Sequence, residues 1–589
     1  MKKIPPMCCA ALITIASLLV GSGCGSGKTN IDGALLISIS VISSSPSLTV
    51  GATQQFTAMG NYEDNTTLDI TDKVIWTSSD PNRAAISETG LATAIAPGKT
   101  SITAKLAFVD STTGLTILLP PPAQTQWARI DNAASASSSD FHGVSVAHDG
   151  SIYAAGSIES RYTHDLGNGI ATGGTVTAGR NSVLAKYDSS GTAQWVRTVV
   201  SGTGFSMFNS VATASSGSVY AAGYMDGTRT FDFGNAVTAA GRSVGHNLVL
   251  VHYDASGTAQ WVSAVVSGTG TSVLNGVAAA SDGSVYAAGS IAGTGTFDLG
   301  NGVTVAGPSV GSNILLVKYD SAGIAQWART MAAGDSDSAF DSVTVASDGS
   351  VYAAGFMTGT GTYDLGNAVQ AKELFNFTNA ILVKYSSSGE VQWVRNAHGM
   401  PAVVNALTDY SEYASVSAAP DGSVYAAGYI SSKGPFSFGN DVAITVSTIH
   451  DISAVVLVKY DPSGTAQWAR TVAPGSDYSD FRGVSAAADG SVYAVGLTSG
   501  DGIYDFGSGV MFAGGSDRFM IVKYSTAGTA LWAKTMDQWA TSWFSGVSAA
   551  PDGSVCAAGT IYGAGTYDLG NGVTAAGYSF QDFLLVNYQ

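Results

Sequence analysis

The chain has 589 residues, too many for one ordinary hydrophobic core, so we expect several domains or an array of repeats. Hydrophobic residues make up 45% of the chain and charged residues 12%, which allows a packed interior and excludes a highly charged disordered chain. The net charge of −17 excludes nucleic acid as an expected partner, because a phosphate backbone would be repelled.

Residues 1–23 have the pattern of an export signal. Two lysines precede an apolar run from Met7 to Val20, which is too short to span a bilayer, and small residues follow before Cys24. The pattern resembles the bacterial lipoprotein signal, although Gly21 stands where that family usually has leucine. The resemblance implies cleavage before Cys24 and lipid attachment to it, and hence a lipid-anchored place in the cell envelope, at the outer membrane or cell surface. The alternative is ordinary cleavage nearby, which leaves Cys24 as a free thiol.

The remaining cysteines predict neither a disulfide nor a metal site. Cys8 and Cys9 leave with the signal, so Cys556 is the only cysteine after Cys24. Two G-x-S-x-G matches, at 241–245 and 307–311, lie at loop positions without the following helix that a hydrolase needs. We therefore expect no catalytic residue, metal or cofactor, and interpret residues 24–32 as a flexible tether.

Residues 33–118 alternate short apolar stretches with turn residues, the pattern of a small β-sandwich. The segment resembles the bacterial immunoglobulin-like group 2 family at Gly51, Trp76, Ser78, Ser79, Asp80, Ile86, Gly90, Thr93, Gly98 and Ile102. We expect Trp76 in the core, because a buried indole anchors such sandwiches. The resemblance implies a surface stalk or adhesive module, and the proline-rich residues 119–123 predict an extended linker.

Residues 124–589 contain seven copies of one unit. Each combines a GVSAAPDGSVYAAG-like hairpin, a YDLGNGVTAAG-like stretch and an LVKYDSSGTAQW-like hairpin. Four strands per unit follow, which in the first copy are Gly143–Ala147, Ser151–Ala155, Val183–Tyr187 and Ala193–Thr198, here called A, B, C and D. A tryptophan recurs in strand D every 64–75 residues, at Trp127, Trp195, Trp261, Trp327, Trp393, Trp468 and Trp532.

The seven copies predict an all-β chain in which the sandwich is followed by a seven-bladed β-propeller. The copies resemble the SBBP family of propeller repeats, which pairs a DGSVYAAG-like hairpin with an LVKYDxxGxxxW hairpin. The last copy starts at Phe544 and ends with Phe583–Tyr588 as its strand C. Gln126–Ile130 is an unattached strand D, so we predict that this N-terminal strand closes the last blade. The alternative is a last blade of three strands.

The connections predict which end of the propeller binds a ligand. The A–B and C–D turns are minimal, whereas the B–C and D–A connections are long, and we expect both long sets together on the opposite face. The most variable D–A connections place aromatic, acidic and histidine side chains on this rim, at His398, Asp409, Tyr410, Tyr478, Trp539 and Trp543. An equally good interpretation is that Trp539 and Trp543 fill gaps between blades. We interpret the repeated tryptophans and strand-B tyrosines as packing, and Cys556 as a core substitution for such a tyrosine.

The sequence therefore predicts an exported, lipid-anchored protein with a non-catalytic binding or adhesive role. Its expected partners are the membrane, through the lipid, and a glycan or an envelope or host protein. One alternative is an exported polysaccharide hydrolase or lyase that uses rim carboxylates. Another is a structural envelope protein.

Overall fold

The computed structural model describes residues 30–31, 34–133, 137–159, 161–175, 179–334, 336–359, 361–373, 378–399, 410–431, 435–445, 453–473, 477–536 and 540–589. This part of the chain is all-β and contains no helix, and so none that could cross a membrane. It divides into two compact units, one formed mainly by residues 34–117 and one by residues 118–589. The predicted signal, Cys24, Asp409 and Trp539 lie outside the described residues.

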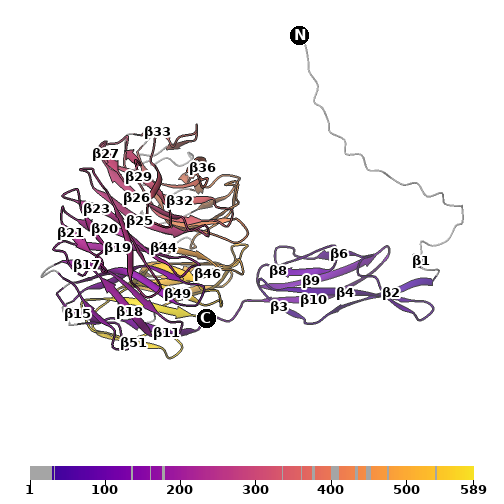
Figure 1. Cartoon of the computed structure of the whole chain (residues 1–589). Coiled ribbons are helices and arrows are strands. Elements are labelled where there is room, and N and C mark those ends of the chain that lie inside the picture. Colours follow the sequence, from indigo (N-terminus) through magenta and orange to yellow (C-terminus); the bar gives the residue numbers. More distant parts are fainter. Residues whose placement is uncertain are drawn as a thin grey trace, which may run out of the picture. The chain divides into compact units, whose positions relative to one another are not determined.

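The first unit is a sandwich of two antiparallel sheets (Figure 1). In spatial order, one sheet contains β1 (Asn30–Ile31), β2 (Ala34–Ser43), β4 (Thr53–Tyr62), β8 (Leu91–Ala94) and β7 (Ala84–Ile86), with β5 (Thr67–Asp69) beside β4. The other contains β3 (Ser47–Thr49), β10 (Val109–Leu118), β9 (Gly98–Leu106) and β6 (Ile75–Ser78). Alternate residues of β4 are buried, as expected when one face of a strand covers a core.

Trp76 lies in the core of the sandwich, as the sequence predicted. Its side chain is buried, and its ring centroid lies 6.5 Å from that of Phe56 in an edge-to-face contact. The indole nitrogen donates a hydrogen bond to the Thr71 carbonyl at 3.0 Å, so the one polar atom of this large side chain is satisfied.

The second unit contains seven four-stranded antiparallel sheets among its described residues. We number them 1 to 7 and give the strands in the order A, B, C, D. Sheet 1 is β13 (Ser139–Val146), β14 (Ile152–Glu159), β17 (Arg180–Tyr187) and β18 (Ala193–Thr198). Sheet 2 is β19 (Ser206–Thr213), β20 (Val219–Asp226), β23 (His246–Tyr253) and β24 (Ala259–Ala264). Sheet 3 is β25 (Ser272–Ala279), β26 (Val285–Ala292), β29 (Ser312–Tyr319) and β30 (Ala325–Arg329).

Sheets 4 to 7 repeat this order. Sheet 4 is β31 (Ser338–Val345), β32 (Val351–Thr358), β35 (Thr378–Tyr385) and β36 (Val391–Asn396). Sheet 5 is β38 (Tyr410–Ala418), β39 (Val424–Ser431), β42 (Ala454–Tyr460) and β43 (Ala466–Arg470). Sheet 6 is β44 (Tyr478–Ala486), β45 (Val492–Asp505), β46 (Met511–Tyr524) and β47 (Ala530–Thr535). Sheet 7 is β48 (Ser542–Ala549), β49 (Val555–Tyr562), β52 (Gln581–Tyr588) and β11 (Thr125–Ile130).

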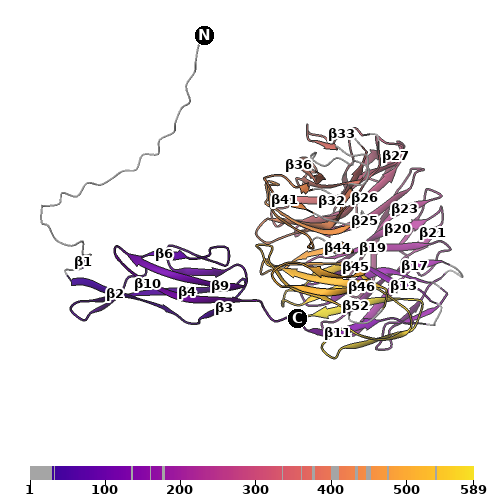
Figure 2. The ribbon, with the colours of Figure 1, turned by 180° about the vertical axis from the view of Figure 1, so that it is seen from behind.

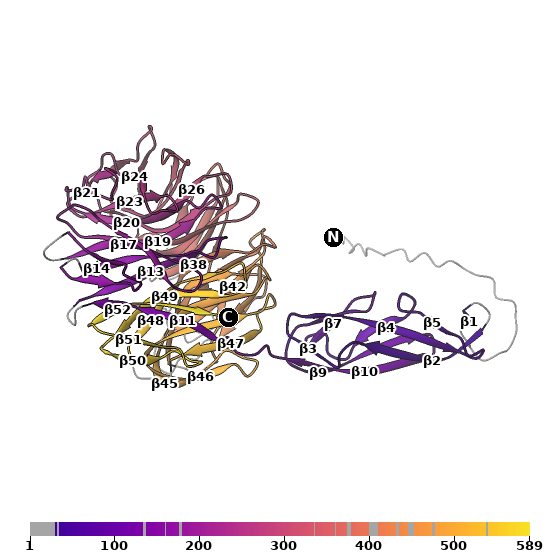
Figure 3. The same ribbon diagram turned by 60° about the horizontal axis from the view of Figure 1, so that its bottom comes forward.

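The N-terminal strand of this unit completes its last sheet. Strand β11 pairs antiparallel with β52, with Trp127 opposite Asn587 and Ile130 opposite Leu584. Figure 2 shows the purple β11 beside the yellow β52, and Figure 3 shows both near β48 and β49. The predicted pairing of these two chain segments is therefore present, and strand C of sheet 7 has a neighbour on both sides.

Hydroxyl groups link each strand A to the preceding sheet. Ser139 Oγ, at the start of β13, accepts a hydrogen bond from the Phe583 backbone nitrogen of sheet 7 at 2.9 Å. The equivalent bond joins the other consecutive sheets through Ser206, Ser272, Ser338, Ser411, Ser479 and Ser542. Sheet 7 thus contacts sheet 1 through the same interaction that joins sheets next to each other in sequence.

The strand-D tryptophans also bind across sheets. Trp127 Nε1 donates to the Ser189 carbonyl in the C–D turn of sheet 1, at 3.0 Å. Arg129 lies over this indole and donates from Nε to the Gly191 carbonyl at 2.6 Å. Five further tryptophans donate to the C–D turn of the next sheet, namely Trp195, Trp261, Trp327, Trp393 and Trp468. The interpretation of the repeated tryptophans as packing between neighbouring units is confirmed.

The B–C connections form hairpins that pair with the D–A connections. One such hairpin is β15 (Thr163–Asp165) with β16 (Ala171–Gly173), and the D–A strand β12 (Asn132–Ala133) pairs with β15. Asn168 at the hairpin tip donates to the Ala193 carbonyl, where strand D begins beside the C–D turn. The two sets of long connections therefore meet, as predicted, although the B–C connections are hairpins that extend along strand D rather than open loops. In sheet 6 the ends of β45 and β46 form this hairpin. The other hairpins are β21 (Thr230–Asp232) with β22 (Thr238–Ala240), β27 (Thr296–Asp298) with β28 (Thr304–Ala306), β33 (Gly361–Asp364) with β34 (Gln370–Glu373), β40 (Pro435–Ser437) with β41 (Ala443–Thr445), and β50 (Gly565–Asp568) with β51 (Thr574–Gly577).

Candidate functional site

A hollow of about 370 Å³ lies where strands A of sheets 5 and 6 begin, at the end that the D–A connections enter. Two predicted rim residues, Tyr410 and Tyr478, line it. They hold the same repeat position, directly before the serine that joins each strand A to the preceding sheet. The sequence therefore placed two of its six rim residues at one concave site.

Hydrogen bonds fix the polar groups around this hollow. Tyr410 Oη lies 2.6 Å from Ser453 Oγ, and Tyr429 donates from its hydroxyl to Glu412 Oε2 at 2.6 Å. The rings of Tyr410 and Tyr429 meet edge to face, with their centroids 5.9 Å apart. Each ring of the sheet 5 wall is thus held in place by a neighbour, so less side-chain conformational entropy is lost when a ligand binds.

An acid–base pair forms the sheet 6 wall. Asp480 is buried and accepts hydrogen bonds from Tyr478 Oη at 3.1 Å and from Leu497 N at 3.3 Å. Arg482 donates to Asp480 from Nε at 3.2 Å, and its guanidinium lies 5.3 Å from the ring centroid of Trp543. Trp543, a third predicted rim residue, therefore contributes to this wall through its contact with the Arg482 guanidinium.

The two other acidic groups nearby hold their protons more tightly than usual. Burial raises the pKa of Glu412; the Tyr429 hydrogen bond opposes this shift, and the charge of Asp480 adds to it. Burial also raises the pKa of Asp341 well above its ordinary value, and Glu412 adds to that shift. Asp341 Oδ2 has no hydrogen-bond partner among the described residues. A neutral carboxyl group can donate as well as accept a hydrogen bond, so this region offers both functions.

The hollow adjoins a second, smaller hollow of about 200 Å³. Three consecutive residues from each of the seven strands A line this second hollow, and Ala414 and Arg482 line both spaces. In sheet 6 a β-bulge lies between Phe481 and Gly483, so Arg482 is the extra residue of its strand. The equivalent residues of the other sheets are His142, Asn209, Asn275, Asp341, Ala414 and Ser545.

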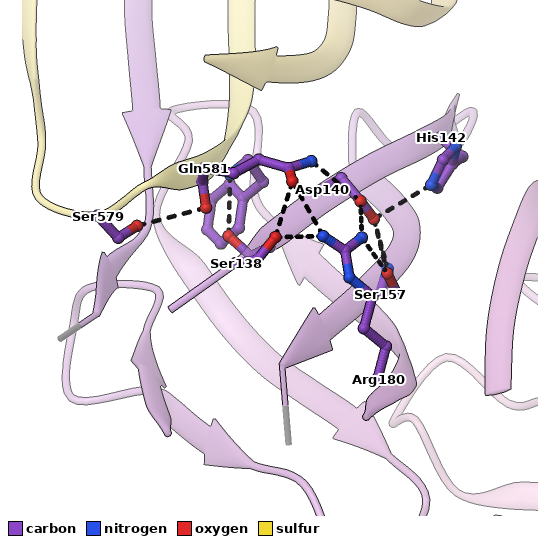
Figure 4. Close-up of polar contacts among 9 residues, drawn as sticks. Ser138, Asp140, His142, Ser157, Arg180, Ser579 and Gln581 are labelled. Atoms are coloured by element: carbon purple, nitrogen blue, oxygen red, sulfur yellow. Dashed lines mark hydrogen bonds and ion pairs between the residues drawn. The ribbon is translucent and has the colours of Figure 1, made fainter. Parts of the chain in front are cut away.

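Sheets 7 and 1 have a second polar cluster at the same repeat position (Figure 4). Arg180 pairs with Asp140, and its second nitrogen donates to Gln581 Oε1 at 2.9 Å. Gln581 Nε2 in turn donates to Asp140 Oδ2 at 3.2 Å. Burial alone would raise the pKa of Asp140, but His142 and Arg180 outweigh burial and hold this pKa below its ordinary value. Since its members satisfy one another across two sheets, this cluster is better suited to joining them than to binding a ligand.

The predicted and observed site residues overlap only in part. His398 lies in β37 (His398–Gly399), opposite Ser437 of β40. The sequence analysis missed Glu412, Tyr429, Asp480 and Arg482. A comparison of the copies would have shown one signal: the residue after the strand-A serine is acidic only in copies 1, 5 and 6.

The described residues contain no group of three or more histidine, cysteine, aspartate or glutamate side chains that could hold a metal ion. Each aspartate of the YDLGN-like stretches instead caps a turn. Asp165 Oδ1, for example, accepts the Gly167 backbone hydrogen bond at 2.8 Å. Cys556 is buried, and burial raises the pKa of its thiol to about 12, as expected for a core residue rather than a nucleophile.

The family model of the bacterial Ig-like domain (group 2) matches residues 37–114, so this segment is a domain of that kind. Ice-binding protein 1 of Shewanella frigidimarina is 47% identical over 90 residues, 14% of this chain and 10% of that protein. Regulatory protein FlaEY of Caulobacter vibrioides is 32% identical over 204 residues, 33% of this chain and 20% of that protein. The chain thus spans a fifth or less of these curated relatives.

Among solved structures, a quinonprotein alcohol dehydrogenase-like protein from Bacteroides thetaiotaomicron is 11% identical to this chain. The match covers 83% of this chain and 93% of the other, with a TM-score of 0.28.

Proposed function

We propose that this protein is an exported lipoprotein, anchored through Cys24, that binds a carbohydrate without transforming it. In this proposal the seven sheets are the blades of a closed β-propeller built from SBBP-type repeats, and β11 closes the ring. The hollow between sheets 5 and 6 is the binding site. The signal pattern of residues 1–24 supports the anchor, and the hydrogen bond from Phe583 to Ser139 supports the closed ring.

One observation carries the binding proposal: three tyrosines, an arginine and two acidic groups line one hollow of about 370 Å³. This volume lies within the range of about 300–1,000 Å³ that is usual for small-ligand sites. Tyrosine rings present apolar faces on which a sugar ring can lie, and Glu412, Asp480 and Arg482 can bond its hydroxyl groups. The internal hydrogen bonds keep these groups in place before the ligand arrives.

The binding proposal is tested by screening the purified protein on a glycan array and repeating the positive glycans with Tyr478→Ala and Tyr410→Ala. We expect each variant to weaken binding at least tenfold with little loss of thermal stability. Phe205→Ala is the matched control, because Phe205 holds the same repeat position in sheet 2 and stacks on Tyr224 at 6.1 Å. Binding that survives both tyrosine variants, or is lost equally in the control, would contradict this site. A protein ligand in place of glycans, or no ligand at all, would favour the adhesive or structural alternative.

A polysaccharide-cleaving enzyme is the second candidate, and the raised pKa of Glu412 favours it. A protonated carboxyl group beside a second carboxylate is the arrangement that general acid catalysis requires. If the protein is such an enzyme, Glu412→Gln abolishes release of reducing ends from a bound polysaccharide while binding persists. If the proposed binding role is correct, neither the natural protein nor the variant releases product.

A further inference from the structure

A larger hollow, of about 600 Å³, lies between sheets 7 and 1 at the end of the short A–B and C–D turns. The indole of Trp127 and the side chains of Cys556 and Asn587 line it from sheet 7. Asp552 in the A–B turn of sheet 7, and His148, Asp149 and Gly150 in that of sheet 1, also line this space. It lies at the opposite end of the strands from the proposed carbohydrate site and does not depend on it.

A comparison of the seven sheets explains why the hollow is there. In each sheet, three residues on strands B, C and D lie opposite one another and form a cross-strand row. Sheets 1, 3, 4, 5 and 6 have tyrosine, lysine and tryptophan in this row, as in Tyr286, Lys318 and Trp327, and sheet 2 has histidine in place of lysine. Sheet 7 has Cys556, Asn587 and Trp127. A phenol ring and a lysine side chain are therefore replaced by two much smaller groups.

In several of the other sheets the tyrosine or the lysine bonds to polar groups of the surrounding turns. The Tyr425 hydroxyl donates to the Gly490 carbonyl of the next A–B turn at 3.3 Å. Lys384 Nζ donates to the Pro462 carbonyl of the next C–D turn at 3.0 Å. Lys459 Nζ pairs with Asp421 of its own A–B turn at 3.1 Å. The lysine also lies over the tyrosine ring, at 5.4 Å in the case of Lys459 and Tyr425.

Sheets 7 and 1 retain these acceptors but lack the tyrosine and lysine donors. Gly150 corresponds to Gly490, Ser189 corresponds to Pro462, and both line the hollow. Asp552 corresponds to Asp421, and no lysine or arginine forms an ion pair with it among the described residues. Asn587, which replaces the lysine, donates from its side-chain amide to Cys556 Sγ at 3.2 Å and not to a turn of sheet 1. An indole, carbonyl oxygens and the carboxylates of Asp552 and Asp149 therefore surround a space in which the tyrosine ring and lysine ammonium group of the other sheets are absent.

We propose that this hollow binds a small organic cation, namely a primary amine attached to a flat ring, in the place of the missing tyrosine and lysine. The ring would lie against Trp127 above Cys556, and the ammonium group would approach Asp552 and the turn carbonyls. The charge of the ligand matters because two carboxylates, Asp552 and Asp149, line the hollow and attract a cation. Asp149 already interacts with Lys186, so Asp552 supplies the larger part of the attraction. An anionic compound of the same size would be repelled.

Tyramine is the probe that reproduces both missing groups, a phenol and an ammonium, and equilibrium dialysis of the full-length protein measures its binding. We expect one site per chain, and at least tenfold weaker binding of p-cresol, which lacks the amine, and of 4-hydroxyphenylpropionate, which carries a negative charge. Asp552→Asn should weaken tyramine binding about tenfold and leave p-cresol unchanged, since the amide can still accept the Ser554 backbone hydrogen bond.

Restoring the common row provides the decisive comparison. The double substitution Cys556→Tyr with Asn587→Lys should abolish binding, because the chain then fills its own hollow. Tyr286→Cys with Lys318→Asn makes the reverse change in sheet 3 and should create a second tyramine site. Equal binding by the natural protein and the Cys556→Tyr, Asn587→Lys variant would overturn the proposal, as would equal affinity for tyramine and the anionic analogue.

Discussion

Trp127 lies directly opposite Asn587 in the pairing of β11 with β52, although the two residues lie far apart in sequence. The same indole donates to Ser189 of sheet 1, so one side chain contacts the last sheet and the first. The pairing with Asn587, unlike the hydrogen bond to Ser189, can form only after β52 has been synthesised. We therefore expect the second unit to gain much of its stability late in folding, because long-range pairings carry the largest loop-closure cost.

Replacement of Trp127 should destabilise this junction strongly. Trp127→Ala removes a buried indole together with its hydrogen bond, and such changes cost about 3–5 kcal/mol of unfolding free energy. Urea unfolding followed by hydrogen exchange of β52 amides measures the effect. Gln126→Ala is the control, because this neighbouring side chain is exposed and should change stability by less than about 0.5 kcal/mol. Equal effects of the two variants would show that β11 does not hold the junction.

The glycine of the first C–D turn is needed for two separable reasons. Gly191 has a φ of +75°, and a Cβ atom there would lie 2.6 Å from Trp127. Gly167 has a φ of +88° but no atom within 4 Å of such a Cβ. We expect Gly167→Ala to cost about 1–2 kcal/mol from the backbone alone. Gly191→Ala should cost clearly more, and the difference in thermal unfolding between the two variants measures the packing part.

The repeat made the strands predictable, because each copy carries the same turn and strand signals in the same order. The expected strand D of the first copy, Ala193–Thr198, has the same bounds as β18. The B–C hairpins were not predicted, since Asn168 reaches a strand-D carbonyl through tertiary folding rather than through a local pattern. Tyr410 and Tyr478 were found because they are unusual aromatic residues in variable loops. Glu412 and Arg482 were missed because they lie within strands, where a charged residue is interpreted as solvent-facing.

Asp582 should make the protein less stable at neutral pH than at mildly acidic pH. Burial raises its pKa from 3.8 to about 6, and Asp131 adds to the shift while His164 opposes it. A raised pKa means that the folded protein binds the proton more tightly, so stability is lost as the pH rises from about 4 through 6. At pH 8 this cost approaches about 3 kcal/mol.

Asp582→Asn should remove that cost. Four other sheets have asparagine at this position, and Asn247 shows that the amide both accepts from Ser243 N at 2.7 Å and donates to Gly245 O at 3.0 Å. We expect the variant to have a higher melting temperature than the natural protein at pH 8 and nearly the same one at pH 4. A stabilisation that does not change with pH would contradict the assignment to this carboxyl group.

Asp140 should have the opposite pH dependence. His142 and Arg180 outweigh burial and hold its pKa below 3.8, so its contribution to stability is present above about pH 4 and is lost as the pH falls through the folded value. Asp140→Asn leaves Arg180 without its carboxylate in a largely buried cluster, a change that costs about 3–5 kcal/mol at pH 7. Thermal unfolding of both proteins from pH 7 to pH 2 should show this difference shrinking only below about pH 4. A difference that disappears while the pH is still above 5 would contradict the assignment to Asp140.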